Sequence, residues 1–237
     1  MRLGMLTPSS NTVLEPLTAA MLADLPGASA HFSRFRVVAI DLGPGSREQF
    51  DPAPVVAAAE LLADARVDAI CWNGTSGAWL GLDLDRALCE AVAACTGLPA
   101  TTATLALMEA LRRLGARRYG LVTPYLGEVQ AAIVSRWAAA GLECAAERHL
   151  DDPGNFSFAA HGEDAVRRMA REVAAAEPDA VVVHCTNFRG GRVAPELEAE
   201  LGLPVLDSVA VALWGAVLAA GGDAAPMARR WGQVFAL

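Results

Sequence analysis

Short apolar runs alternate along this chain with alanine-rich stretches in which apolar positions recur at helical spacing. The short runs predict six strands, at residues 3–6, 31–38, 69–72, 120–122, 143–148 and 180–184. The longer stretches predict eight helices, at residues 12–23, 54–63, 85–94, 102–113, 127–140, 163–176, 194–201 and 208–219. Such alternation is typical of parallel sheets that are covered by helices on both faces.

The pattern also repeats itself. Residues 4–8 (Gly-Met-Leu-Thr-Pro) match residues 120–124 (Gly-Leu-Val-Thr-Pro), and Gly-Leu-Pro occurs at both 97–99 and 202–204. Aligning residues 68–75 with 179–186 places Gly74 on Cys185. The interval between the matching segments is too long for the repeat of a solenoid protein. It predicts two copies of one α/β unit. We therefore expect two pseudo-symmetric, doubly wound lobes, residues 1–113 and 114–237, with the active site in the cleft between them.

The composition of the chain argues against several classes of protein. Hydrophobic residues make up 54% of the 237 residues, but no apolar run reaches the length of a membrane span. The N-terminal apolar stretch meets Pro8 too early for a signal-peptide core, which favours a cytoplasmic protein. The net charge of −8 and the scattered arginines argue against nucleic-acid binding.

Cysteine and histidine spacing is equally informative. The five cysteines and four histidines form no metal-ligand spacing and no Cys-x-x-Cys pair, so we expect free thiols and no metal. Nucleotide-binding glycine motifs are missing as well, and we expect no organic cofactor.

In open α/β sheets, ligands bind beyond the carboxyl ends of the strands. Four loops occupy such positions: Pro8-Ser9-Ser10-Asn11, Gly74-Thr75-Ser76, Pro124-Tyr125 and Cys185-Thr186-Asn187. Helix N-termini present free N–H groups, so the four loops together predict an anion pocket. The same serine, threonine and asparagine side chains could instead serve as helix caps, and Tyr125 could be a packed aromatic residue.

Cys185 differs from the other cysteines because it follows directly after a predicted strand. We expect the next helix to lower the pKa of its thiol and to prepare it for proton transfer or attack. Cys71 lies within a predicted strand, and Cys89 and Cys95 lie in or near a helix, where a packing role is the default. His184 should point to the opposite face of its strand, as a core or interface residue.

Taken together, these motifs resemble a known family. The run Thr7-Pro8-Ser9-Ser10-Asn11-Thr12, then Tyr125 after Thr-Pro, then Asn155, then Cys185-Thr186 are similar, in order and spacing, to the aspartate/glutamate racemase superfamily. Within it the chain resembles the branch of maleate cis-trans isomerase and arylmalonate decarboxylase, which also includes an ectoine-utilisation group. The resemblance implies a cofactor-independent enzyme acting on a small dicarboxylate. It also implies a catalytic role for Cys185 and substrate contacts for Asn11, Tyr125 and Asn155.

The chain departs from the superfamily at one position. Isomerases and racemases of this kind carry a cysteine in each lobe, but Gly74 stands at the first position here. Cys71 cannot replace it, because three strand residues span about 10 Å. The Gly-Thr-Ser run looks like that of the decarboxylase, whereas Asn11 looks like that of the isomerase.

Three functions therefore remain open. In a decarboxylase, Ser10, Asn11, Thr75 and Ser76 would hold one carboxylate while the other leaves from an apolar pocket, and Cys185 would protonate the product. Trp72 and Trp79 are candidates for that pocket or for the core. In an isomerase, Cys185 alone would add to the double bond of an unsaturated diacid. A non-catalytic dicarboxylate-binding protein is the third possibility. Exposed helices on two such lobes are compatible with a homodimer.

Overall fold

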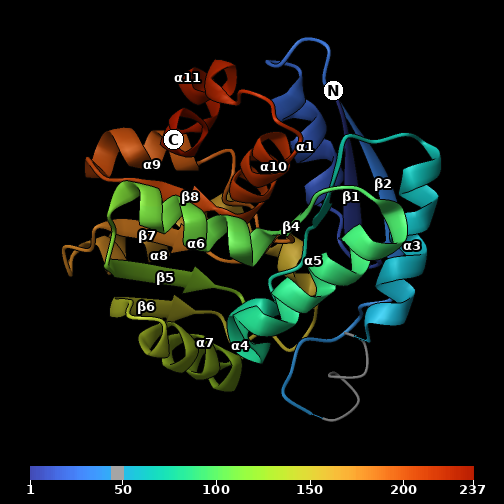
Figure 1. The fold of residues 1–237 in the computed structure, drawn as a ribbon. Helices are drawn as coiled ribbons and strands as arrows, with labels where there is room; N and C mark the ends of the chain where they lie inside the picture. The colour runs from blue at the N-terminus through green and yellow to red at the C-terminus, as the bar shows by residue number, and fades with distance from the viewer. Residues whose placement is uncertain (44–50) are drawn as a thin grey trace.

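The computed structural model describes residues 1–43 and 51–237 and contains two parallel four-stranded sheets (Figure 1). The first sheet has the order β2-β1-β3-β4, with bounds β1 (Arg2–Pro8), β2 (Ser29–Phe35), β3 (Ala69–Trp72) and β4 (Ala100–Thr102). The second has the order β6-β5-β7-β8, with bounds β5 (Arg118–Thr123), β6 (Glu143–His149), β7 (Ala180–Val183) and β8 (Val205–Asp207). The shared order confirms the predicted α/β fold with two related halves.

Helices connect the strands of both sheets. In the first half they are α1 (Leu14–Leu22), α3 (Pro52–Asp64), α4 (Gly77–Leu80), α5 (Leu82–Thr96) and α6 (Ala103–Leu114). In the second half they are α7 (Gly127–Ala139), α8 (Glu163–Ala174), α9 (Ala194–Leu201), α10 (Ser208–Ala219) and α11 (Ala228–Trp231), with short 3₁₀ turns at Ser157–Ala160, Ala225–Met227 and Gln233–Ala236. Each of the eight predicted helices is present, with ends shifted by at most three residues.

Helix α10 joins the two halves. It follows β8 of the second sheet, yet it packs against α6, β3 and β4 of the first (Figure 1). Residues 208–217 are all buried, as expected for a helix that is apolar on every side. Gly215 allows the close approach, because a Cβ atom there would lie 2.6 Å from the Cβ atom of Ala106. The predicted lobe boundary at residue 113 falls in the last turn of α6.

A second connection runs through irregular segments. The chain beyond β2 reaches the second half, where Ala39 and Gly154 form an isolated antiparallel bridge. In the part of the chain that the structure describes, no helix has the length and apolar character needed to cross a membrane.

Candidate active site

A small cavity lies where the exits of β1, β3, β5 and β7 meet. It is lined by eight residues from the predicted loops and motifs that were expected to contact the substrate: Pro8, Gly74, Thr75, Ser76, Tyr125, Asn155, Cys185 and Thr186. The remaining lining residues are Val37, Ile40, Trp72, Trp79 and Asn187. The two sheets therefore bring polar loops from both halves to one apolar-walled cavity.

Cys185 is buried at the exit of β7, with 3% of its surface exposed. Burial raises the pKa of its thiol to about 12, although hydrogen bonds from Tyr125 and from the backbone of Asn187 oppose the shift. The expectation of a lowered pKa is wrong. Helix α9 begins only at Ala194, and a helix dipole acts over little more than its first turn. At neutral pH the site therefore holds a protonated thiol.

Tyr125 connects this thiol to the first half of the chain. Its hydroxyl lies 2.6 Å from the hydroxyl of Thr75, and it also hydrogen-bonds Cys185. The ring packs edge-on against Trp79 and Phe158, with centroids 5.4 Å away in both cases. Burial raises the pKa of Tyr125 well above its usual range, so the phenol keeps its proton and can donate a hydrogen bond.

Backbone donors add to these hydroxyls. Among the residues that the structure describes, none accepts a hydrogen bond from the backbone N–H groups of Thr75, Ser76 and Thr186. The three residues line the cavity, and none of its described lining residues is an arginine. An anion bound here would be held by neutral N–H and O–H donors, the arrangement that stabilises oxyanions in acyl-transfer and enolate chemistry.

Ser10 and Asn11, which were expected to hold a carboxylate, are not among the described residues that line the cavity. The hydroxyl of Ser10 donates to the carbonyl of Val37 at 2.8 Å. Asn11 is buried; its Oδ1 atom accepts from the backbone of Leu14 at 2.9 Å, and its Nδ2 atom donates to Thr186 at 3.1 Å. Both side chains therefore hold loops in place, and Asn11 caps the start of α1 from within the interface.

Asn187 belongs to one of the four predicted loops, although no individual role was predicted for its side chain. Its Oδ1 atom accepts from the backbone of Thr12 at 2.9 Å, and its Nδ2 atom donates to the carbonyl of Asn155 at 2.7 Å. Asn155 in turn donates to the carbonyl of Val37 at 3.2 Å. This chain of amides ties the cavity walls of the two halves together. Its sequence signal is its place in the loop that follows Cys185 at the end of a predicted strand.

Two other candidate groups are kept out of the cavity. Cys71 is fully buried in β3, with Sγ 3.6 Å from the carbonyl of Ala212 in α10. His184 is fully buried against Trp137, and burial lowers its pKa to about 3. Neither lines the site, as their strand positions predicted. Within the described ranges, no group of three histidine, cysteine or carboxylate side chains is placed to hold a metal ion.

A family model described as arylmalonate decarboxylase matches residues 15–235. The chain belongs to this family. It is 30% identical over 235 residues to the arylmalonate decarboxylase of Bordetella bronchiseptica, a match that covers 94% of this chain and 91% of the relative. A crystal structure of arylmalonate decarboxylase superposes with a TM-score of 0.80 at 26% identity and covers 100% of this chain and 99% of its own. The structure of maleate cis-trans isomerase of Nocardia farcinica bound to TRIS superposes with a TM-score of 0.87 at 25% identity. The match covers 99% of this chain and 97% of the isomerase chain.

Membership of the arylmalonate decarboxylase and maleate isomerase family confirms the predicted branch of the racemase superfamily. The assignment to an ectoine-utilisation group stays a prediction. Relatives in the family are named for two different reactions, decarboxylation and cis-trans isomerisation, so the family alone does not select one.

Proposed function

We propose that this protein is a cofactor-independent decarboxylase of a small activated dicarboxylate, with Cys185 as the proton donor. One observation carries the proposal: the cavity holds a single thiol, buried and protonated, and the position related to it by the repeat is Gly74. A neutral thiol is a competent acid but a weak nucleophile, since the thiolate is the attacking species.

Substrate binding follows from the lining. One carboxylate would accept hydrogen bonds from the hydroxyls of Thr75 and Ser76 and from free backbone N–H groups. The other would lie against the apolar side chains of Val37 and Ile40. A carboxylate that has lost its water shell is destabilised, whereas neutral carbon dioxide is not, so an apolar wall favours loss of that group.

The chemical steps balance without a cofactor. The bond between the α-carbon and the second carboxylate breaks, carbon dioxide leaves, and the electron pair forms an enediolate on the remaining carboxyl group. Tyr125, Thr75 and the backbone donors stabilise the enediolate charge. The Sγ–H group of Cys185 then protonates the α-carbon. The resulting thiolate, held by Tyr125 and the Asn187 backbone, recovers its proton from water.

Isomerisation of an unsaturated diacid is the second candidate. Asn155, the residue that resembles a substrate contact of the isomerases, does line the cavity. However, addition of Cys185 to a double bond requires a thiolate, and the burial that raises its pKa to about 12 works against that form.

A substrate screen tests the proposal. Wild type, Cys185→Ala and the control Cys95→Ala, which alters an exposed thiol, are incubated with aryl- and alkylmalonates, maleate and amino acids. We expect carbon dioxide release from a malonate, a loss of about 10²–10⁴-fold in kcat for Cys185→Ala, and no change for the control.

Other results would point elsewhere. Fumarate from maleate without carbon dioxide would replace decarboxylation by isomerisation. Tight dicarboxylate binding with no turnover would indicate a binding protein. A Cys185→Ala variant as fast as wild type on the true substrate would remove the thiol from the mechanism.

A further inference from the structure

The indole ring of Trp72 lies directly over the Cα atom of Gly74. A Cβ atom added to Gly74 would lie 2.0 Å from Cζ2, 2.2 Å from Cε2 and 2.7 Å from Nε1 of that ring. Carbon atoms in favourable contact are about 3.5–4.0 Å apart. The indole therefore fills the volume into which any side chain at position 74 would extend, including the cysteine of a two-thiol relative.

Neighbouring residues hold Trp72 in this position. It is the last residue of β3, paired in register with Leu6 on one side and Thr102 on the other. Only 4% of its surface is exposed, and its ring packs on Phe35 with centroids 4.7 Å apart. The atoms that would clash belong to the rigid fused ring, so the whole indole would have to rotate away from Phe35. The indole and a side chain at position 74 thus exclude each other.

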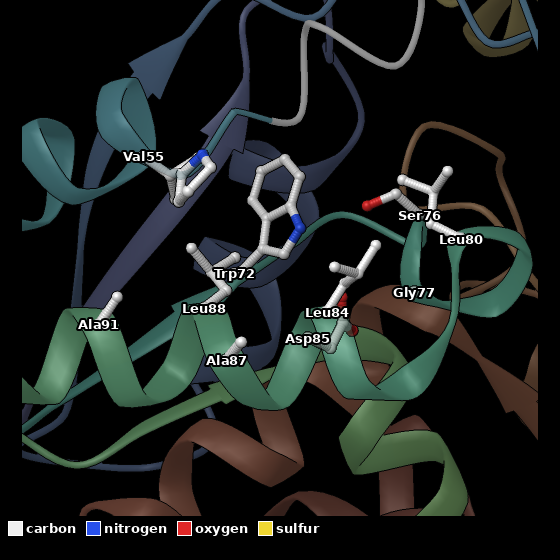
Figure 2. A pocket seen from close by; sticks show the side chains of 11 residues that line it. Val55, Trp72, Ser76, Gly77, Leu80, Leu84, Asp85, Ala87, Leu88 and Ala91 are labelled. Atoms are coloured by element: carbon white, nitrogen blue, oxygen red, sulfur yellow. The ribbon is translucent and has the colours of Figure 1, made fainter.

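Trp72 also separates two cavities. Behind it, between α3 and α5, lies a second, larger cavity with aliphatic walls that include Val55, Leu84 and Leu88 (Figure 2). Among the residues that the structure describes, Trp72 and Ser76 line both this cavity and the site cavity. The indole is therefore part of the wall between a polar reaction site and an apolar chamber.

We propose that Trp72 restricts protonation of the substrate to one face. It excludes a second catalytic side chain at position 74, and it covers the face of the bound substrate that is turned away from Cys185. Water and other acids are kept from that face, so the new C–H bond forms only on the side of the thiol. The stereochemical part rests on the proposed decarboxylation, whereas the exclusion at position 74 does not.

The same geometry predicts how specificity changes. A smaller side chain at position 72 would join the two cavities, and the aliphatic walls of α3 and α5 would then accept an apolar aryl or alkyl substituent. We expect Trp72→Leu to decarboxylate malonates with bulkier substituents than wild type accepts.

Thermal unfolding of four proteins tests the exclusion without any activity: wild type, Gly74→Cys, Trp72→Leu and the double variant. We expect Gly74→Cys to lower Tm by roughly 4–10 °C in the wild-type background and by less than about 2 °C in the Trp72→Leu background. Gly162→Cys is the control, since a Cβ atom there meets nothing within 4 Å. If Gly74→Cys lowers Tm equally in both backgrounds, or in neither, the indole of Trp72 does not exclude a side chain at position 74. Trp72→Phe replaces Trp72→Leu if the latter does not fold.

Product stereochemistry tests the shielding. With a malonate that carries two different α-substituents, we expect one enantiomer from wild type and an enantiomeric ratio at least about tenfold lower from Trp72→Leu. The double variant should also racemise the product and exchange its α-hydrogen with deuterated water, because Cys185 and the new thiol face each other. An equally pure product from Trp72→Leu would refute shielding. If wild type decarboxylates no malonate, the proposed function fails, while the unfolding experiment still decides the exclusion at position 74.

Discussion

At the scale of single residues, the neighbours of Cys185 decide what its thiol can do. A strand-exit cysteine next to a helix N-terminus would be a nucleophile, but the segment between Cys185 and α9 leaves the thiol without that dipole. Tyr125 and the Asn187 backbone stabilise the thiolate only after it has formed. In the proposed decarboxylation, the residue would give up a proton to a strong carbon base and take one back.

The first prediction concerns the reactivity of this thiol. We expect iodoacetamide at pH 8 to modify Cys185 at least about 100-fold more slowly than the exposed Cys95, because the thiol is buried and burial raises its pKa to about 12. The rate should rise as pH increases towards 10, since thiolate accumulates. Mass spectrometry of peptides after timed quenching follows both cysteines in one sample. Comparable rates at pH 8 would contradict a protonated resting thiol.

The second prediction concerns Tyr125. Tyr125→Phe removes the hydroxyl that lies 2.6 Å from Thr75 and that hydrogen-bonds Cys185. We expect kcat to fall about 10²-fold with a smaller change in KM, because the donor acts on charge that develops during the reaction. Loss of this hydrogen bond should also raise the pKa of Cys185 further and slow its alkylation. Tyr119→Phe, in the buried core of β5, is the control and should leave kcat unchanged.

Single residues also show where prediction from sequence stops. Gly74, Thr75, Tyr125 and Cys185 were predictable, because the carboxyl ends of parallel strands meet at one edge. Val37 and Ile40 come from an irregular segment beyond β2, whose path depends on packing against the distant second half. Apolar residues outside any periodic element carry no signal that separates a site wall from the core.

At the scale of elements, hydrophobic periodicity found every long helix but missed the shortest pieces. Strands β4 and β8 have three residues each, and α4 has four, too few for a period of two or 3.6 to be visible. Their places follow from the repeat, since both strands come directly after the duplicated Gly-Leu-Pro segment. Each short strand then continues into a capped helix, α6 or α10.

The third prediction tests how the loops of one half support an element of the other. Asn187→Ala leaves the backbone N–H groups of Thr12 and Val13 and the carbonyl of Asn155 without this partner. We expect the free energy of unfolding to fall by about 1–3 kcal/mol, because the buried carbonyl of Asn155 and the N–H of Thr12 lose this partner, whereas the N–H of Val13 keeps Asn11 as acceptor. Urea unfolding followed by circular dichroism measures the loss. Asp51→Ala, at the exposed cap of α3, should cost only about 1 kcal/mol.

At the scale of the whole molecule, both halves bury a carboxyl group at the helix that follows their last strand. Asp207 caps α10 through the backbone of Val209 at 2.9 Å, and Asp85 accepts a hydrogen bond from Thr102, the cap of α6. Burial raises the pKa of Asp207 to about 7 and that of Asp85 to about 6. The folded state therefore binds more protons than the unfolded state between pH 4 and 7. The stability these groups contribute is complete below about pH 4 and is lost as pH rises through 6 to 7.

Asp207→Asn tests this pH dependence of stability most directly. Asparagine keeps the oxygen that caps α10 but carries no charge, so the variant has no desolvation cost at high pH. We expect it to match wild type near pH 4.5 and to be more stable at pH 8, by an amount on the order of a few kcal/mol. Urea unfolding at pH 4.5, 6 and 8 gives the difference curve. A variant less stable than wild type at pH 8 would mean that the charged form of Asp207 is favoured inside the fold.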